Sequence, residues 1–148
     1  MTAVEVLDPP PFAAPLRAVD RIDLLPAEPG GSTRVRAVKT VRVTDPYLGG
    51  HFPDLTMLPG VFLVEKVRQV AAAVLGPRDG AYPEVRELRS ARFLLPMLGG
   101  EEISSDIELT GTGTDADEVE AAVRCRRGDG RPVATLALRL GWGAPDAP

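Results

Sequence analysis

Residues Pro59 to Leu75 read as one helix that is apolar on almost every side. Pro59 suits the first helical position, because its ring has no N–H to leave unpaired, and Gly76-Pro77 ends the helix. A helix that is apolar nearly all round is buried. The rest of this 148-residue chain must therefore cover it.

Segments with the alternation of strands follow the helix. Four of them are Val85–Pro96, Glu101–Gly111, Asp117–Arg127 and Pro132–Trp142. Such alternation is typical of an antiparallel sheet with one buried face, and Gly128-Asp129-Gly130 predicts a tight hairpin between the last two strands.

The region before the helix is less regular. Thr33–Val43 is rich in β-branched residues and is expected to be a strand, whereas Leu16–Leu25 could be a strand or a short helix. We therefore predict an α+β fold in which an antiparallel sheet wraps around one long central helix. The uncovered flank of the helix could be closed by curling the sheet or by sharing a continuous sheet with a second copy.

The chain length fits one domain, because two would each have a small core. We expect that domain to span residues 13–143. Residues 1–12, with Pro9, Pro10 and Pro11, are expected to be a flexible arm, since three prolines cannot propagate a helix or pair in a central strand. Residues 144–148 are expected to be a frayed tail.

Composition excludes several classes of function. The net charge of −4 gives no bias toward nucleic acid, and no apolar run approaches the length that spans a membrane. The N-terminus lacks the pattern of a secretory signal, so we expect a cytoplasmic protein. The single cysteine, Cys125, cannot form an internal disulfide and has no partners at metal-ligand spacing.

The chain's only histidine, His51, lies 14 residues before Glu65, a carboxylate within the apolar helix. The surrounding motifs, Gly50–Pro53 (Gly-His-Phe-Pro) and Leu58–Val61 (Leu-Pro-Gly-Val), with Glu65 and Gln69 after them, resemble those of the FabZ-type 3-hydroxyacyl-acyl-carrier-protein dehydratases of bacterial fatty acid synthesis. The resemblance extends over roughly Thr33 to Leu140. It departs from the family at Asp54, where glycine is usual, and in lacking an N-terminal Pro-His-Arg motif.

The resemblance implies a hot-dog fold and a dehydratase that converts 3-hydroxyacyl thioesters to trans-2-enoyl thioesters. Loss of water needs a base for the α-proton and an acid for the leaving hydroxyl. By resemblance His51 is the base, Glu65 the acid, and the Gly60 N–H the donor to the thioester oxygen. An imidazole titrates near neutral pH, and apolar surroundings favour a protonated carboxyl.

The resemblance also implies that Val61 and Phe62 line an acyl tunnel, and Gln69 is expected to orient Glu65 or a water. No metal or organic cofactor is expected. The expected partners are an acyl carrier protein and a second protomer, in a homodimer, a larger homo-oligomer or a heterodimer with a related subunit. In the family, the histidine of one protomer faces the glutamate of its partner.

The sequence leaves two other functions open. The chain could be a non-catalytic hot-dog subunit that supports an active partner, although such a subunit has no need of His51 and Glu65. It could also be an acyl thioesterase of the same fold, which has less reason to keep the Gly-His-Phe-Pro loop. Fatty acid and polyketide synthesis are both possible pathways for a dehydratase.

Overall fold

One helix and nine strands form in the described part of the computed structural model, residues 2–7, 17–26, 30–42, 57–111 and 117–143. The helix, α1, spans Val61–Leu75. The strands are β1 (Thr2–Val4), β2 (Arg21–Leu24), β3 (Thr33–Thr40), β4 (Met57–Leu58), β5 (Glu84–Phe93), β6 (Met97–Leu98), β7 (Glu102–Thr110), β8 (Glu118–Arg127) and β9 (Pro132–Gly141).

Seven of these strands form one antiparallel sheet in the order β1-β2-β3-β7-β8-β9-β5, and β4 pairs separately with β6. The four strands predicted after the helix are confirmed as β5, β7, β8 and β9. The predicted hairpin joins β8 to β9, where the Arg127 N–H donates to Arg131 O at 2.9 Å. Gly130 adopts a φ of 86°, a conformation that glycine reaches without strain.

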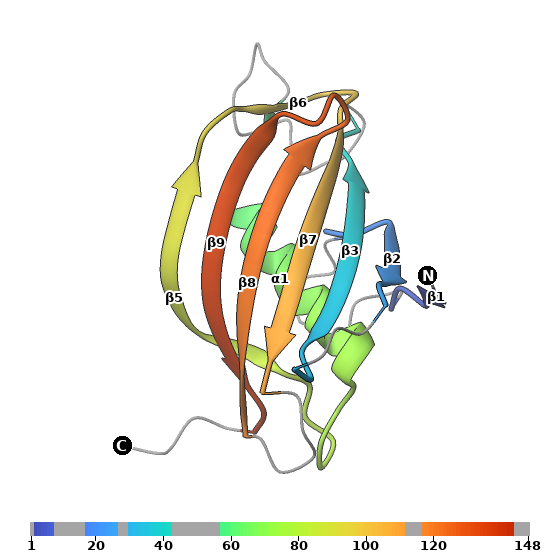
Figure 1. Cartoon of the computed structure of the whole chain (residues 1–148), viewed down its shortest axis with the longest axis vertical. Coiled ribbons are helices and arrows are strands. Elements are labelled where there is room, and N and C mark those ends of the chain that lie inside the picture. The colour runs from blue at the N-terminus through green and yellow to red at the C-terminus, as the bar shows by residue number, and fades with distance from the viewer. Residues whose placement is uncertain (1, 8–16, 27–29, 43–56, 112–116, 144–148) are drawn as a thin grey trace.

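The sheet curves around α1, which lies against its concave face (Figure 1). Inward-facing residues alternate along the strands, as Val119, Ala121, Val123 and Cys125 do on β8, and they pack on the buried side of the helix. This is the predicted arrangement of a sheet wrapped around a single helix. The helix in the described residues is not long and apolar enough to cross a membrane.

The helix begins two residues later than the sequence predicts. The Phe62 N–H donates to Pro59 O and the Leu63 N–H to Gly60 O, both at 3.0 Å and both across three residues. This spacing is that of a tight turn, so Pro59 and Gly60 lead into α1 without belonging to it.

The N-terminal segment is partly paired. Thr2–Val4, within the residues expected to be a flexible arm, forms the edge strand β1 against β2, and Val4 packs on the core. The prediction of a flexible arm is therefore wrong for Thr2–Val4. The exposed edge of β2 offers backbone hydrogen-bond partners to this short segment, which contains two β-branched residues. The three prolines lie outside the described residues. Leu16–Leu25, left open between helix and strand, contains β2.

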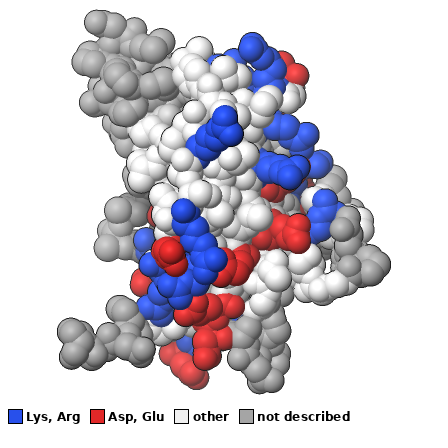
Figure 2. Space-filling view, turned by 60° about the vertical axis from the view of Figure 1, so that its left-hand side comes forward, with Lys and Arg blue, Asp and Glu red and all other residues white. Residues whose placement is uncertain are grey.

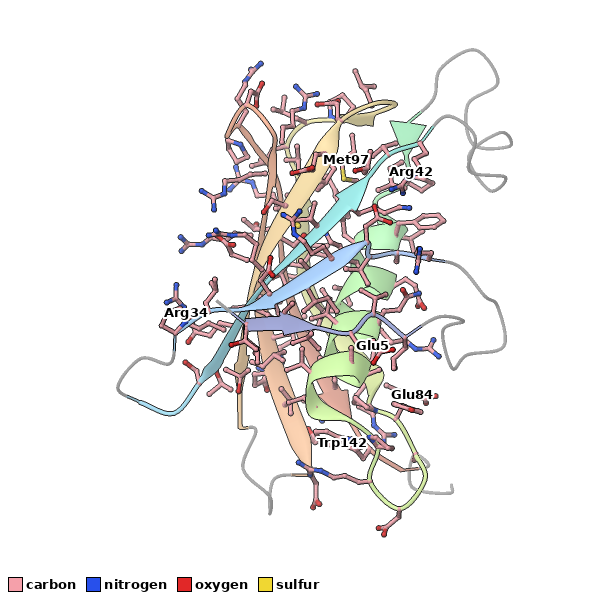
Figure 3. The ribbon with its side chains drawn as sticks, turned by 90° about the vertical axis from the view of Figure 1, so that its right-hand side faces the viewer. Glu5, Arg34, Arg42, Glu84, Met97 and Trp142 are labelled. Carbon is pink, nitrogen blue, oxygen red and sulfur yellow. The ribbon has the colours of Figure 1, made fainter. Side chains whose placement is uncertain are left out.

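A tryptophan fixes the far end of the helix. Trp142, directly after β9, donates its indole Nε1–H to Gly76 O at 3.0 Å, and the Arg78 guanidinium stacks 3.6 Å from its ring centroid. Figure 3 shows Trp142 beside the C-terminal end of α1, with Met97 at the opposite end of the molecule. The start of the helix therefore lies toward Met97.

Both lysines of the chain lie inside the fold. The Lys66 Nζ, on α1, donates to Ile103 O at 3.0 Å and to Ser105 Oγ at 2.8 Å, so it ties the helix to β7. Burial lowers the pKa of Lys66 to about 8, because the charged ammonium is cut off from water. Lys39, on β3, lies 3.9 Å from Asp20 Oδ1.

Candidate active site

An apolar cavity of about 450 Å³ opens at the start of α1. Its lining comes from two chain segments, Leu58–Val61 before and at the helix start and Phe93–Met97 from the end of β5 to the start of β6. The lining residues are Leu58, Gly60, Val61, Phe93, Leu94, Leu95, Pro96 and Met97. Pairing of β4 with β6, through Met57–Leu98 and Leu58–Met97, brings these segments together. A cavity of this size and lining suits an acyl chain.

Gly60 lies in close contact with the cavity wall. A Cβ at this position would lie 2.6 Å from Phe93 Cε1 and 2.7 Å from Phe93 Cζ, so a side chain here would displace the ring. Within the described residues the Gly60 N–H has no hydrogen-bond partner. A glycine N–H at a helix start, beside an apolar cavity, is suited to bind an oxygen that gains negative charge.

The Glu65 side chain is one and a half turns further along α1 and is partly buried. Its Oε1 accepts a hydrogen bond from Gln69 Nε2 at 3.1 Å. Its Oε2 lies 3.7 Å from Arg68 Nη1, an ion pair longer than a hydrogen bond. Both partners come from the next turn of the same helix, where residues three and four positions apart share a face.

Gln69 is buried and uses both ends of its amide. Its Oε1 accepts from the backbone N–H of Ala18 at 3.0 Å, while its Nε2 donates to Glu65. The segment before β2 is thereby tied to the helix residue that contacts the carboxylate.

The structure places the predicted site residues in two groups. Gly60 and Val61 line the cavity, and Glu65 and Gln69 are hydrogen-bonded to each other. Phe62 packs in the hydrophobic core and is not among the residues that line this cavity, and Glu65 is not among them either. His51 lies outside the described residues.

The cavity residues of Phe93–Met97 were not identified as site residues from the sequence. A signal was present, because Ala91–Ile103 resembles a later strand of the FabZ family. Ala18 carries no such signal, since it contributes only its backbone N–H.

A sheet wrapped around one buried helix is the hot-dog fold, and here a carboxylate lies on that helix and an apolar cavity opens at its start. Residues 28–129 match the family of ApeI-like proteins, described as the ApeI dehydratase. The chain belongs to this family of dehydratases.

Individual relatives agree with this assignment. The chain is 34% identical over 103 residues to the 3-hydroxyacyl-[acyl-carrier-protein] dehydratase FabZ of Syntrophotalea carbinolica, covering 67% of each. It is also 34% identical over 103 residues to the FabZ of Natranaerobius thermophilus, covering 68% of this chain and 70% of the relative. The fold resembles the dehydratase heterocomplex ApeI:P from Xenorhabdus doucetiae, with a TM-score of 0.59, 18% identity, and coverage of 80% of this chain and 96% of that one.

Proposed function

We propose that this protein removes water from 3-hydroxyacyl thioesters carried on an acyl carrier protein and releases trans-2-enoyl thioesters. The observation that carries the proposal is a Gly60 N–H at the wall of an apolar cavity, directly before α1, together with the Glu65 carboxylate that Gln69 holds on α1. The likeness to FabZ dehydratases supports the choice of substrate.

Each residue has one role in the proposed reaction. His51 removes the α-proton, and the electron pair moves to form the double bond. The C–O bond at the β-carbon breaks as Glu65 gives its proton to the leaving hydroxyl, which departs as water. The Gly60 N–H binds the thioester oxygen while it carries negative charge. A proton passed from His51 back to Glu65 restores the starting state.

The acyl chain is proposed to occupy the cavity beside Gly60. Val61 is two-thirds exposed and lines it, as does Phe93, about half exposed. Phe62, which is packed in the core, is proposed to shape the inner end of the acyl site and not its mouth.

The free edge of β5 supports assembly with a second protomer. β5 pairs only with β9 among the described strands, and Leu88 and Phe93 on it are exposed, as are Val61 and Leu94 nearby. Figure 2 turns this side forward and shows a largely uncharged area in the upper middle, with basic side chains to its right, above a mixed cluster of basic and acidic side chains. A second copy that continues the sheet along β5 would cover the unpaired edge and these side chains. We propose a dimer of this kind, in which His51 of one protomer serves Glu65 of the other.

The arginines of β5 differ in their availability to a carrier protein. Arg86 donates to Trp142 O at 2.8 Å, and Arg89 pairs with Glu120 at 3.0 Å, so both serve the fold. Arg92 is exposed and directly precedes the cavity residue Phe93. We propose Arg92 as the strand arginine that meets an acidic carrier. The cytoplasmic location expected from the sequence stays a prediction.

Mass spectrometry of an incubated 3-hydroxyacyl carrier protein tests the function. The expected result is loss of one water from the acyl group. Release of a free acid would instead indicate a thioesterase, and an unchanged substrate would indicate a non-catalytic subunit. The His51→Ala and Glu65→Ala variants are expected to lose dehydration, whereas Val70→Ala, a core change on the same helix, is expected to keep it. Full rates in both site variants would overturn the residue assignment.

A further inference from the structure

The amide of Gln69 can adopt only one useful orientation. A backbone N–H is always a donor, so the atom that faces the Ala18 N–H must be an acceptor, and this is Oε1 at 3.0 Å. The opposite end of the amide, Nε2, then faces Glu65 Oε1 at 3.1 Å and can only donate. Turning the amide over would set two donors against each other at Ala18.

We propose that this chain of hydrogen bonds, from Ala18 to Gln69 to Glu65, fixes Oε2 of Glu65 as the atom that carries the catalytic proton. The inference rests on the proposed dehydratase function. With Nε2 donating to it, Oε1 serves as the carbonyl oxygen of the protonated carboxyl, because the carbonyl oxygen of a carboxyl is a stronger acceptor than its hydroxyl oxygen. Oε2 then bears the O–H. Gln69 is a positioning residue in this scheme, and Ala18 sets its orientation.

The surroundings of the chain of hydrogen bonds make it rigid. Ala18 and Gln69 are both buried, at 2% and 6% exposure, so water cannot readily replace either partner. Arg68 Nη1 lies 3.7 Å from Oε2, beyond hydrogen-bond length, so among the described side chains the hydrogen bond to the Glu65 carboxyl is the one from Gln69 to Oε1. The contact between residues 51 positions apart also makes the segment before β2 part of the site.

Two substitutions at Gln69 separate the two hydrogen bonds. Gln69→Glu keeps an oxygen that accepts from Ala18 but, as a carboxylate, has no donor for Glu65. Gln69→Met has a similar length and offers neither group. A purely structural role predicts that Gln69→Glu behaves like wild type in activity, whereas the positioning role predicts that both variants lose turnover.

The experiment measures amide hydrogen exchange and steady-state kinetics on the full-length protein. In Gln69→Met the Ala18 N–H should exchange at least about tenfold faster than in wild type, and in Gln69→Glu it should stay protected. Both variants should lose kcat on the order of 10- to 100-fold with little change in KM. Val70→Ala, a buried change one position along the helix, is the control and should keep both kcat and the protection of Ala18.

The outcomes separate this proposal from the function it rests on. Wild-type turnover in Gln69→Glu would overturn the positioning role while leaving the dehydratase intact. Unchanged exchange at Ala18 in Gln69→Met would show that the first hydrogen bond does not exist. If wild-type protein forms no enoyl product, the proposed function fails and the role of Oε2 falls with it, although the exchange result still reports on the hydrogen bonds.

Discussion

Replacing Lys66 with methionine measures the cost of a cation held inside the fold. The Lys66 side chain is 1% exposed, and its Nζ has two neutral partners, Ile103 O at 3.0 Å and Ser105 Oγ at 2.8 Å. Methionine has nearly the same length and no charge. Replacing a buried charge with an apolar side chain of similar volume is often neutral or stabilising.

The pH dependence of folding stability gives the size of the penalty for burying the Lys66 cation. The pKa of Lys66 falls from 10.5 to about 8 on folding, with burial as the main cause. Between these two values the unfolded chain binds more protons at this site, so stability rises with pH there; below about 8 both states are protonated and the full penalty is present. That penalty is roughly 3 kcal/mol at pH 7 and about 1 kcal/mol at pH 10. The stability advantage of Lys66→Met over wild type should therefore shrink by roughly 2 kcal/mol from pH 7 to pH 10.

Urea unfolding of wild type and Lys66→Met at several pH values between 7 and 10 checks this prediction. Burial raises the pKa of the Cys125 thiol and the Lys66 ammonium lowers it, so both proteins carry Cys125→Ala in this comparison. The difference between them then reports the titration of Lys66. Leu63→Met, a buried apolar change on the same helix, should keep the pH dependence of wild type. A difference between wild type and Lys66→Met that stays constant from pH 7 to pH 10 would refute the reasoning.

Three further substitutions test contacts elsewhere. Gly60→Ala should lower turnover more than stability, because the new Cβ meets the half-exposed Phe93 ring at 2.6 Å; the added change Phe93→Ala should partly restore turnover in the carrier-protein assay. Asp20→Asn should destabilise the fold by about 2 kcal/mol in urea unfolding, because it removes the anion next to the buried Lys39 and bonded to Arg42. Trp142→Phe should cost about 1 kcal/mol by thermal denaturation followed by circular dichroism, because the indole N–H no longer caps the helix end.

The layout of the fold could be predicted from local patterns. Alternation along β7, β8 and β9 reports which residues face the core, because successive side chains of a strand point to opposite faces. The apolar composition of α1 predicted its burial, and Pro59 and Gly76 marked its ends to within two residues. Thr2–Val4 was missed as a strand, because its pairing depends on β2, which is not adjacent in sequence.

The polar residues of the helix show the limit of such patterns. Lys66 and Gln69 are two of the few polar residues of α1, yet both are buried. A lysine can be buried here because a backbone carbonyl of β7 and Ser105 accept hydrogen bonds from it. These partners are 37 and 39 residues away in the sequence. Helical periodicity carries no information about partners at that distance.

The sequence by itself determined the class of fold, the family, the place of Gly60 at the start of the helix and that of Glu65 and Gln69 on one face of it, because motif spacing and helical period are local properties of the chain. Only the tertiary structure decided that Phe93 closes on Gly60 and that Ala18 orients Gln69. These contacts join segments far apart in the chain. They depend on strand register and on the way the helix lies across the sheet, which no single segment encodes.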